Sequence, residues 1–167
     1  SKVTVSEYIV KYLKACGVTH YFGYQGTMIA YFVDAIHREN GVYNHVSYNE
    51  QGAALAASGY AKATGEMAVA YATSGPGAIN LLQGIADAYY DSAPVLFITG
   101  QLNLSEYTDH PQLRQQGFQQ TDIVNICKPI TQNALMVTSP TDIPKVLDTL
   151  ITDMLRGRKG PVLLDIP

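Results

Sequence analysis

One carboxylate in this sequence stands where a catalytic acid or base could work. Glu50 follows a short apolar segment and begins a helix-like run, residues 50–64, built largely of Ala, Gly and Ser. A carboxylate at a helix N-terminus is usually a cap, worth about 0.3–1 kcal/mol. The helix itself favours a further role, because its small residues allow another backbone or a flat ligand to come very close. These residues are Gly52, Ala53, Ala56, Ala57 and Gly59.

A second candidate segment is Ser74-Gly75-Pro76-Gly77, which turns an apolar run into a helix. Helix N-termini bind anions, so a phosphate site is one interpretation. The segment lacks the lysine of a P-loop and the spacing of a dinucleotide fingerprint, and Pro76 has no N–H to donate. We therefore interpret it as a tight strand-to-helix turn with proline in the first helical turn.

The composition is that of one well-packed domain. The chain has 167 residues, of which 47% are hydrophobic and 15% charged, with a net charge of −3. This balance argues against nucleic acid or an anionic membrane as a partner. No apolar run approaches the roughly 20 residues of a membrane span, and no secretory leader is visible. Cys16 and Cys127 are too few for a disulfide framework or a metal cluster. We expect a cytoplasmic α/β domain.

Strand-like and helix-like segments alternate along the chain, which predicts an α/β fold. We expect a doubly wound parallel sheet of about six strands with helices on both faces. Residues 101–119 are polar, glutamine-rich and without periodicity. The expected strands are 20–24, 46–48, 67–73, 94–100, 130–137 and 160–167, and the expected helices are 5–16, 27–40, 50–64, 79–90 and 139–154.

Ligands of open parallel sheets bind beyond the carboxyl ends of the strands. Four segments leave such ends and should therefore cluster on one rim of the sheet. These segments are Tyr24-Gln25-Gly26, Asn49-Glu50-Gln51, Ser74-Gly75-Pro76-Gly77 and Thr99-Gly100-Gln101.

Several motifs together resemble a known family. They are FGYQG (22–26), YNEQGAALAASGYAKATG (48–65), ATSGPGAINLLQGIADAYYDSAPVLFITGQ (72–101), GFQQTDIV (117–124), KPIT (128–131) and RGRKGPVLLDIP (156–167). In order and spacing they resemble the N-terminal, pyrimidine-binding (PYR) domain of thiamine-diphosphate-dependent enzymes. Within that superfamily the chain is most similar to acetolactate synthase and its pyruvate-oxidase-like relatives.

The resemblance implies a role for each candidate residue. Glu50 corresponds to the glutamate that hydrogen-bonds N1′ of the cofactor's aminopyrimidine and activates the ring as a base. Gln119 would be a second catalytic residue that reaches the cofactor or substrate, and Phe118 would line the substrate pocket. The remaining cofactor-binding residues would be Tyr24, Gln25 and Gly26, which line the thiamine pocket, and Pro76 and Asn80, which flank the pyrimidine.

The same resemblance implies what the chain needs from elsewhere. In the family, Mg²⁺ and the cofactor diphosphate are held by a Gly-Asp-Gly motif in a pyrophosphate-binding domain, and no such motif occurs here. No residue of this chain is therefore expected to bind the metal. The chain ends just after a strand, so we expect residues 1–167 to be one PYR domain of a longer enzyme, inactive when isolated. The implied enzyme decarboxylates a 2-keto acid, with pyruvate as the expected donor, and transfers the acyl carbanion, as in branched-chain amino acid biosynthesis. A homodimer through the helix 50–64 side is implied, and FAD is an option in the full-length enzyme.

Two alternatives stay open. The chain could be a complete subunit of a two-chain 2-keto acid decarboxylase, of the sulfopyruvate decarboxylase type, or a non-catalytic module that binds a nucleotide or dimerises. One departure also bears on the substrate. Acetolactate synthases usually have Tyr-Pro-Gly-Gly where this chain has Tyr24-Gln25-Gly26-Thr27, so the donor and acceptor keto acids stay undetermined.

Overall fold

A six-stranded parallel sheet organises the chain. The structure, a computed structural model, describes residues 2–167, and neighbouring strands follow the order β2-β1-β3-β4-β6-β5. Every pair of neighbours is parallel. This confirms the predicted doubly wound α/β fold. The strands are β1 (His20–Gly23), β2 (Tyr43–Val46), β3 (Ala68–Ala72), β4 (Val95–Gly100), β5 (Asn133–Met136) and β6 (Val162–Ile166).

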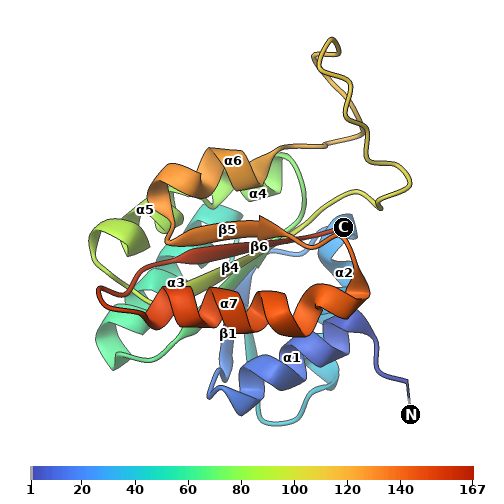
Figure 1. Ribbon diagram of the computed structural model, residues 1–167. Helices are drawn as coiled ribbons and strands as arrows, with labels where there is room; N and C mark the ends of the chain where they lie inside the picture. The colour runs from blue at the N-terminus through green and yellow to red at the C-terminus, as the bar shows by residue number, and fades with distance from the viewer. Residues whose placement is uncertain (1) are drawn as a thin grey trace.

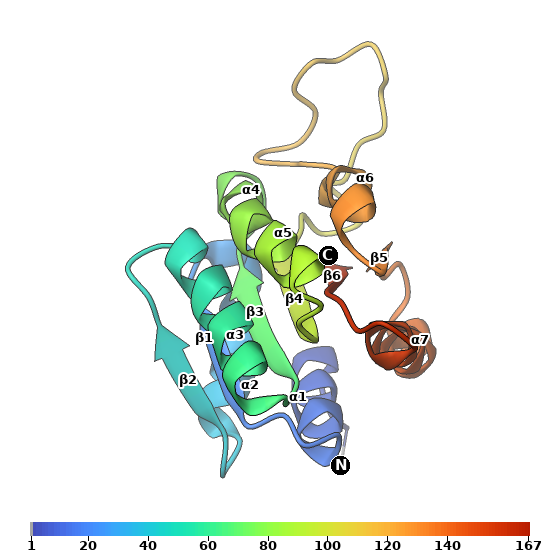
Figure 2. The same cartoon turned by 90° about the vertical axis from the view of Figure 1, so that its left-hand side faces the viewer.

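Helices cover both faces of the sheet, as expected when parallel strands are joined by crossover connections. Figures 1 and 2 show α4, α5 and α6 along one side of the sheet and α1 and α7 along the other. The buried clusters place α2 with α1 and α7, and α3 with α5 and α6. The helices are α1 (Val5–Ala15), α2 (Ala30–Arg38), α3 (Glu50–Thr64), α4 (Pro76–Asn80), α5 (Leu82–Tyr90), α6 (Ile123–Cys127) and α7 (Ile143–Leu155), with short 3-10 turns at Thr27–Ile29, Lys128–Ile130 and Pro140–Asp142.

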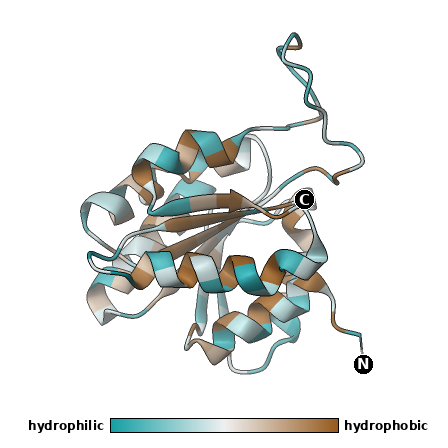
Figure 3. Cartoon of the chain, viewed as in Figure 1, coloured by the Kyte–Doolittle hydropathy of each residue, from teal (hydrophilic) through white to brown (hydrophobic). Residues whose placement is uncertain are grey.

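The two hydrophobic layers differ in the size of their side chains. Strands β3 and β4 are buried over their whole length and form a hydrophobic centre in Figure 3. The α1–α2–α7 side is filled mainly by large side chains, whereas α3 contributes only alanines to the other cluster. A Cβ added to Gly84 of α5 would lie 2.3 Å from the Cβ of Ala54. The small residues of α3 therefore permit close helix–helix packing within the chain itself.

Local signals fix both ends of α3. The side chain of Asn49 accepts a hydrogen bond from the N–H of Gly52 at 2.8 Å, which satisfies one free donor of the first turn. Gly65 ends the helix with φ of +75°, a left-handed conformation that glycine adopts without a Cβ penalty. The helix therefore begins at Glu50, as predicted.

Several elements differ from the sequence prediction, among them the expected helix 139–154, which starts as a 3-10 turn, and the expected strand 130–137, which spans only Asn133–Met136. Strand β2 spans Tyr43–Val46 rather than 46–48, because it is an exposed edge strand without the apolar run that marks an interior strand. The expected helix 27–40 starts as a 3-10 turn, and the expected helix 79–90 is two helices separated by a tight turn at Leu81. Helix α6 was not predicted. Its five residues are too few to show a period, although Asp122 caps it.

A long excursion leaves the sheet between β4 and α6. Residues 101–122 contain no regular helix or strand, and Figure 1 shows them projecting from the end of β4 away from the body. This agrees with the aperiodic, glutamine-rich character of the sequence. The excursion carries Phe118 and Gln119 toward the rim where the strands end.

Candidate active site

The predicted rim exists. A Cβ added to Gly26, after β1, would lie 2.5 Å from the Cβ of Thr73, after β3. A Cβ added to Gly77 would lie 3.2 Å from Oε1 of Glu50, and one added to Gly100 would lie 2.2 Å from the carbonyl oxygen of Met28. The segments that follow β1, β2, β3 and β4 are therefore in direct contact, as their parallel order requires.

Glu50 lies at the centre of this rim. Its side chain is half-buried at the first position of α3. Oε2 accepts a hydrogen bond from Nδ2 of Asn80 at 3.0 Å, so two of the predicted cofactor-binding residues are in contact. Among residues 2–167, no donor forms a hydrogen bond to Oε1. The carboxylate is thus held through one of its two oxygens.

The Ser74–Gly77 turn forms the neighbouring surface. Gly75 has φ of +63° and ψ of −121°, a backbone conformation that glycine tolerates. Pro76 opens α4, which confirms the predicted turn with proline in the first helical turn. The hydroxyl of Ser74 is buried beneath this turn and forms no hydrogen bond with the described residues.

Gln119 reaches the rim through its backbone. A Cβ on Gly75 would lie 2.8 Å from both the Cβ and the carbonyl oxygen of Gln119. The missing side chain at Gly75 therefore allows the excursion to rest against the turn. Gln119 itself has φ of +55°, which is uncommon for a residue with a side chain and typical of functional loops. Its neighbour Phe118 is 68% exposed.

The segment Tyr24-Gln25-Gly26 lies on the same rim, but only its glycine packs closely against it. Gly26 packs against Thr73, whose Oγ1 also accepts a hydrogen bond from the N–H of Met28 at 3.2 Å. Tyr24 and Gln25 are exposed, and within the described part of the chain neither side chain hydrogen-bonds another residue. The glycine is thus built into the rim, and the two side chains before it are available at its surface.

Sequence reasoning missed some contacts that shape the site. Thr73, which was not predicted, fastens the loop after β1, and Gly77, already expected on the rim with its turn, leaves room for the carboxylate of Glu50. Their signal was the dense run of small residues between β3 and α4. A buried network behind the excursion left no signal in the sequence, because it joins residues that are far apart in the chain. Its members are Thr99, Gln101, Thr121 and Asp165.

Asp165 is the charged centre of that network. Burial raises the pKa of its carboxyl group to about 6, although the hydrogen bonds from Thr99 and Gln101 act in the opposite direction, and nearby Asp122 adds to the rise. Burial, with a contribution from Asp165, also raises the pKa of the Cys127 thiol to about 12. Cys127 is therefore a protonated core residue at neutral pH and not a nucleophile.

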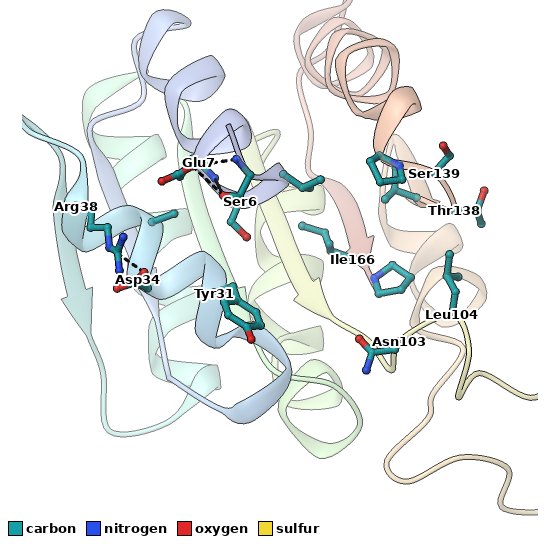
Figure 4. A pocket seen from close by; sticks show the side chains of 16 residues that line it. Ser6, Glu7, Tyr31, Asp34, Arg38, Asn103, Leu104, Thr138, Ser139 and Ile166 are labelled. Carbon is teal, nitrogen blue, oxygen red and sulfur yellow. Dashed lines mark hydrogen bonds and ion pairs between the residues drawn. The ribbon is translucent and has the colours of Figure 1, made fainter. Parts of the chain in front are cut away.

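A cavity of about 650 Å³ lies beside this site. It opens between the start of α1, helix α2 and the end of β6, and its lining includes Glu7, Tyr31, Asn103 and Ile166 (Figure 4). None of the predicted site residues lines it. Within residues 2–167 there is also no group of three or more His, Cys, Asp or Glu side chains that could hold a metal ion. No helix in this part of the chain is long and apolar enough to cross a membrane.

Fold and rim together define an α/β domain with a half-buried glutamate at the ends of its strands. Residues 3–126 match the family described as thiamine pyrophosphate enzyme, N-terminal TPP binding domain. The chain belongs to this family. The residues present are compatible with such a group: among residues 2–167 no donor hydrogen-bonds Oε1 of Glu50, and Gly77 has no side chain beside that oxygen.

Several proteins similar to this chain are named acetolactate synthase. The chain is 41% identical over 162 residues to acetolactate synthase isozyme 2 large subunit of Escherichia coli (strain K12), covering 97% of the chain and 28% of that protein. It is 41% identical over 169 residues to acetolactate synthase of Arthrospira platensis, covering 99% and 28%. It is 40% identical over 162 residues to acetolactate synthase 1, chloroplastic, of Oryza sativa subsp. japonica, covering 97% and 24%. The chain thus spans about a quarter of the length of these relatives.

Proposed function

We propose that this chain is the cofactor-activating domain of a longer enzyme that decarboxylates a 2-keto acid and transfers the acyl group, as an acetolactate synthase does. The observation that carries the proposal is Glu50, which is fixed through Oε2 by Asn80 and has no protein donor on Oε1. The family match and the names of the similar proteins support the class of cofactor and reaction.

The chain's own residues would bind and polarise one end of the cofactor. Thiamine diphosphate, when bound, supplies the carbon nucleophile for decarboxylation and acyl transfer. Glu50 would hold a proton against a weakly basic ring nitrogen, a task that requires a group able to exchange that proton. Asn80 fixes the carboxylate and, with Pro76, would flank the pyrimidine ring. Tyr24, Gln25 and Gly26 would line the thiamine pocket, and Gln119 would reach the cofactor or substrate from the excursion. Phe118 would line the substrate pocket.

The other half of the site would come from outside this chain. The proposal assigns the Mg²⁺ and the diphosphate to a pyrophosphate-binding domain in the same longer chain, consistent with relatives about four times as long. FAD, where present, would bind outside residues 1–167. The substrate preference depends in part on Gln25-Gly26-Thr27, and pyruvate is the donor to test first.

We place a homodimer contact on the outer face of α3. Ala53 and Ala57 are buried in the chain's own core, whereas Gly52, Ala56 and Gly59 are exposed on the same helix. A Cβ at Gly59 would meet nothing within 4 Å. This open stripe supports close approach of a second copy, which would bring the two halves of each site together.

The test compares release of carbon dioxide from pyruvate by the full-length gene product and its Glu50→Gln variant, with thiamine diphosphate and Mg²⁺ present. We expect turnover to fall by about 10²–10⁴-fold, the usual contribution of a positioned acid or base. Glu66→Gln is the matched control, because Glu66 lies beyond the other end of α3 and only accepts a hydrogen bond from Tyr60. Equal turnover in wild type and Glu50→Gln would refute the assignment. If the wild-type enzyme does not release carbon dioxide from pyruvate, a panel of other 2-keto acids is tested next. Turnover of one of them identifies a different substrate, and turnover of none shows that the enzyme lacks this class of activity.

A further inference from the structure

Gln101, the first residue after β4, has a buried side chain whose polar groups are all in use. The side chain is only 4% exposed. Its Nε2 donates to Oδ2 of Asp165 at 3.0 Å and to the carbonyl oxygen of Thr121 at 2.9 Å, and its Oε1 accepts from the N–H of Leu102 at 3.1 Å. The two donor bonds join the sheet to the excursion.

The sheet end of this link is rigid. The carboxylate of Asp165, on β6, is 1% exposed and also accepts a hydrogen bond from the Thr99 hydroxyl at 2.7 Å. The N–H of Gln101 donates to the carbonyl oxygen of Ile166 at 2.8 Å, and Val137 N–H donates to that of Asp165 at 3.0 Å. The backbone of Gln101 is therefore held against β6, and Asp165, the partner of its side-chain amide, is held by β4 and by Val137 after β5.

The other end of the link lies two residues from Gln119. Two residues of chain span at most about 7 Å, so a shift of Thr121 is transmitted to Gln119. On its other side, Gln119 rests on the bare backbone of Gly75, where a Cβ would come within 2.8 Å. The segment 119–121 is thus held between Gly75 at the rim and Gln101 at the sheet.

We propose that Gln101 is a positioning residue: its amide ties Thr121 to Asp165 and so holds Gln119 over the cofactor site at the rim. This inference rests on the proposed function, in which Gln119 touches the cofactor or substrate. The link has a structural reason to be a glutamine. Only a side-chain amide of this length supplies two N–H donors for a carboxylate and a carbonyl together with an oxygen for the Leu102 N–H.

The decisive variant is Gln101→Met in the full-length gene product, since Met keeps the volume and removes the hydrogen bonds. We expect kcat for the 2-keto acid to fall about 10- to 100-fold, the effect of a misplaced catalytic group. The KM for the substrate should change by less than about 3-fold, since the ground-state contacts remain. Added to Gln119→Ala, Gln101→Met should cause no further loss, because both changes remove one function.

Thr99→Val is the matched control within the same network. It removes a hydrogen bond to Asp165 but leaves the link between Gln101 and Thr121, so it should lower the melting temperature while kcat stays within about 2-fold. If Gln101→Met fails to fold, Gln101→Asn applies the test more gently, because its amide is one methylene shorter and cannot reach Asp165 and Thr121 together.

The outcomes separate this inference from the proposed function. If Glu50→Gln and Gln119→Ala impair turnover but Gln101→Met does not, the positioning role is wrong and the function stands. If the losses from Gln101→Met and Gln119→Ala multiply, Gln101 acts independently of Gln119, which also overturns the inference. If Gln119→Ala leaves turnover unchanged, the role of Gln119 in the proposed function fails and the positioning role fails with it.

Discussion

Replacing Asp165 by Asn tests the buried network through the pH dependence of folding. The carboxyl group is buried on β6, which lies between β4 and β5. Burial raises its pKa from the ordinary value of 3.8 to about 6. The folded state therefore binds this proton more tightly than the unfolded state does. The resulting stabilisation is fully present below pH 3.8 and is lost as the pH rises through 6.

The expected magnitude follows from that difference in pKa. A shift from 3.8 to about 6 corresponds to about 3 kcal/mol of folding free energy. About 2 kcal/mol of this stabilisation is lost as the pH rises from 4.5 to 7. Asparagine does not titrate, so its loss of one hydrogen-bond acceptor adds an offset that does not depend on pH. The other carboxylates titrate in both proteins and largely cancel in the comparison, with Asp122 the nearest exception.

Urea denaturation of the wild-type chain and the Asp165→Asn variant at pH 4.5, 5.5, 6.5 and 7.5 measures this difference. Relative to wild type, the variant should gain about 2 kcal/mol of unfolding free energy across the series. Asp153→Asn serves as the control, since Asp153 on α7 is a part-buried carboxylate outside the Asp165 network, where it accepts a hydrogen bond from Asn133 and lies 3.9 Å from Arg156. A difference that stays constant with pH would show that the Asp165 carboxylate is ionised throughout, and the argument from burial would be wrong.

Two glycine substitutions test the packing, and a third tests the site. Gly84→Ala should destabilise the chain by about 3 kcal/mol, because the added Cβ would meet the backbone of α3 at 2.6 Å. Gly59→Ala should stabilise the chain by about 0.5–1 kcal/mol, because that position is open. Urea denaturation measures both changes, and equal effects on the free energy of unfolding would contradict the packing. Gly77→Ala places a Cβ 2.8 Å from a methyl of Thr73 and 3.2 Å from Oε1 of Glu50. It should weaken cofactor-dependent turnover of the full-length enzyme about 10-fold or more, and unchanged kinetics would show that Oε1 does not face the ligand.

The rim of the site was accessible to sequence reasoning because it follows from topology. Strands that alternate with helices run parallel, and parallel strands end on one edge. That rule alone placed the segments around Gly26, Glu50 and Gly77 together, and the structure confirms their contact. The hydrogen bond between Glu50 and Asn80 was not predicted: the resemblance placed both residues beside the cofactor, but they are thirty positions apart and no periodicity relates them.

The parts that escaped prediction depend on contacts between distant, irregular segments. The excursion has no periodicity, so nothing in its sequence showed that Gln119 would rest on Gly75. Likewise, the hydrogen bonds from Gln101 to Thr121 and Asp165 join residues 20 and 64 positions apart. A buried carboxylate within a strand looks, in sequence, like an outward-facing residue of an edge strand.

The small residues of α3 also show how one sequence feature can serve two surfaces. The inner face consists mainly of alanines, with Ser58 and part of Tyr60, because α5 approaches α3 so closely at Gly84 that a larger side chain at Ala54 would not fit. That explanation does not extend to Gly52, Ala56 and Gly59, which face outward. Glycine within an exposed helix lowers stability by about 0.5–1 kcal/mol relative to alanine, so Gly59 is unfavourable for the isolated domain. If Gly59→Ala stabilises the isolated chain but weakens self-association of the full-length protein in sedimentation experiments, the outer face of α3 is an interface. If the variant stabilises both forms, the glycine has no such role and the dimer must form elsewhere.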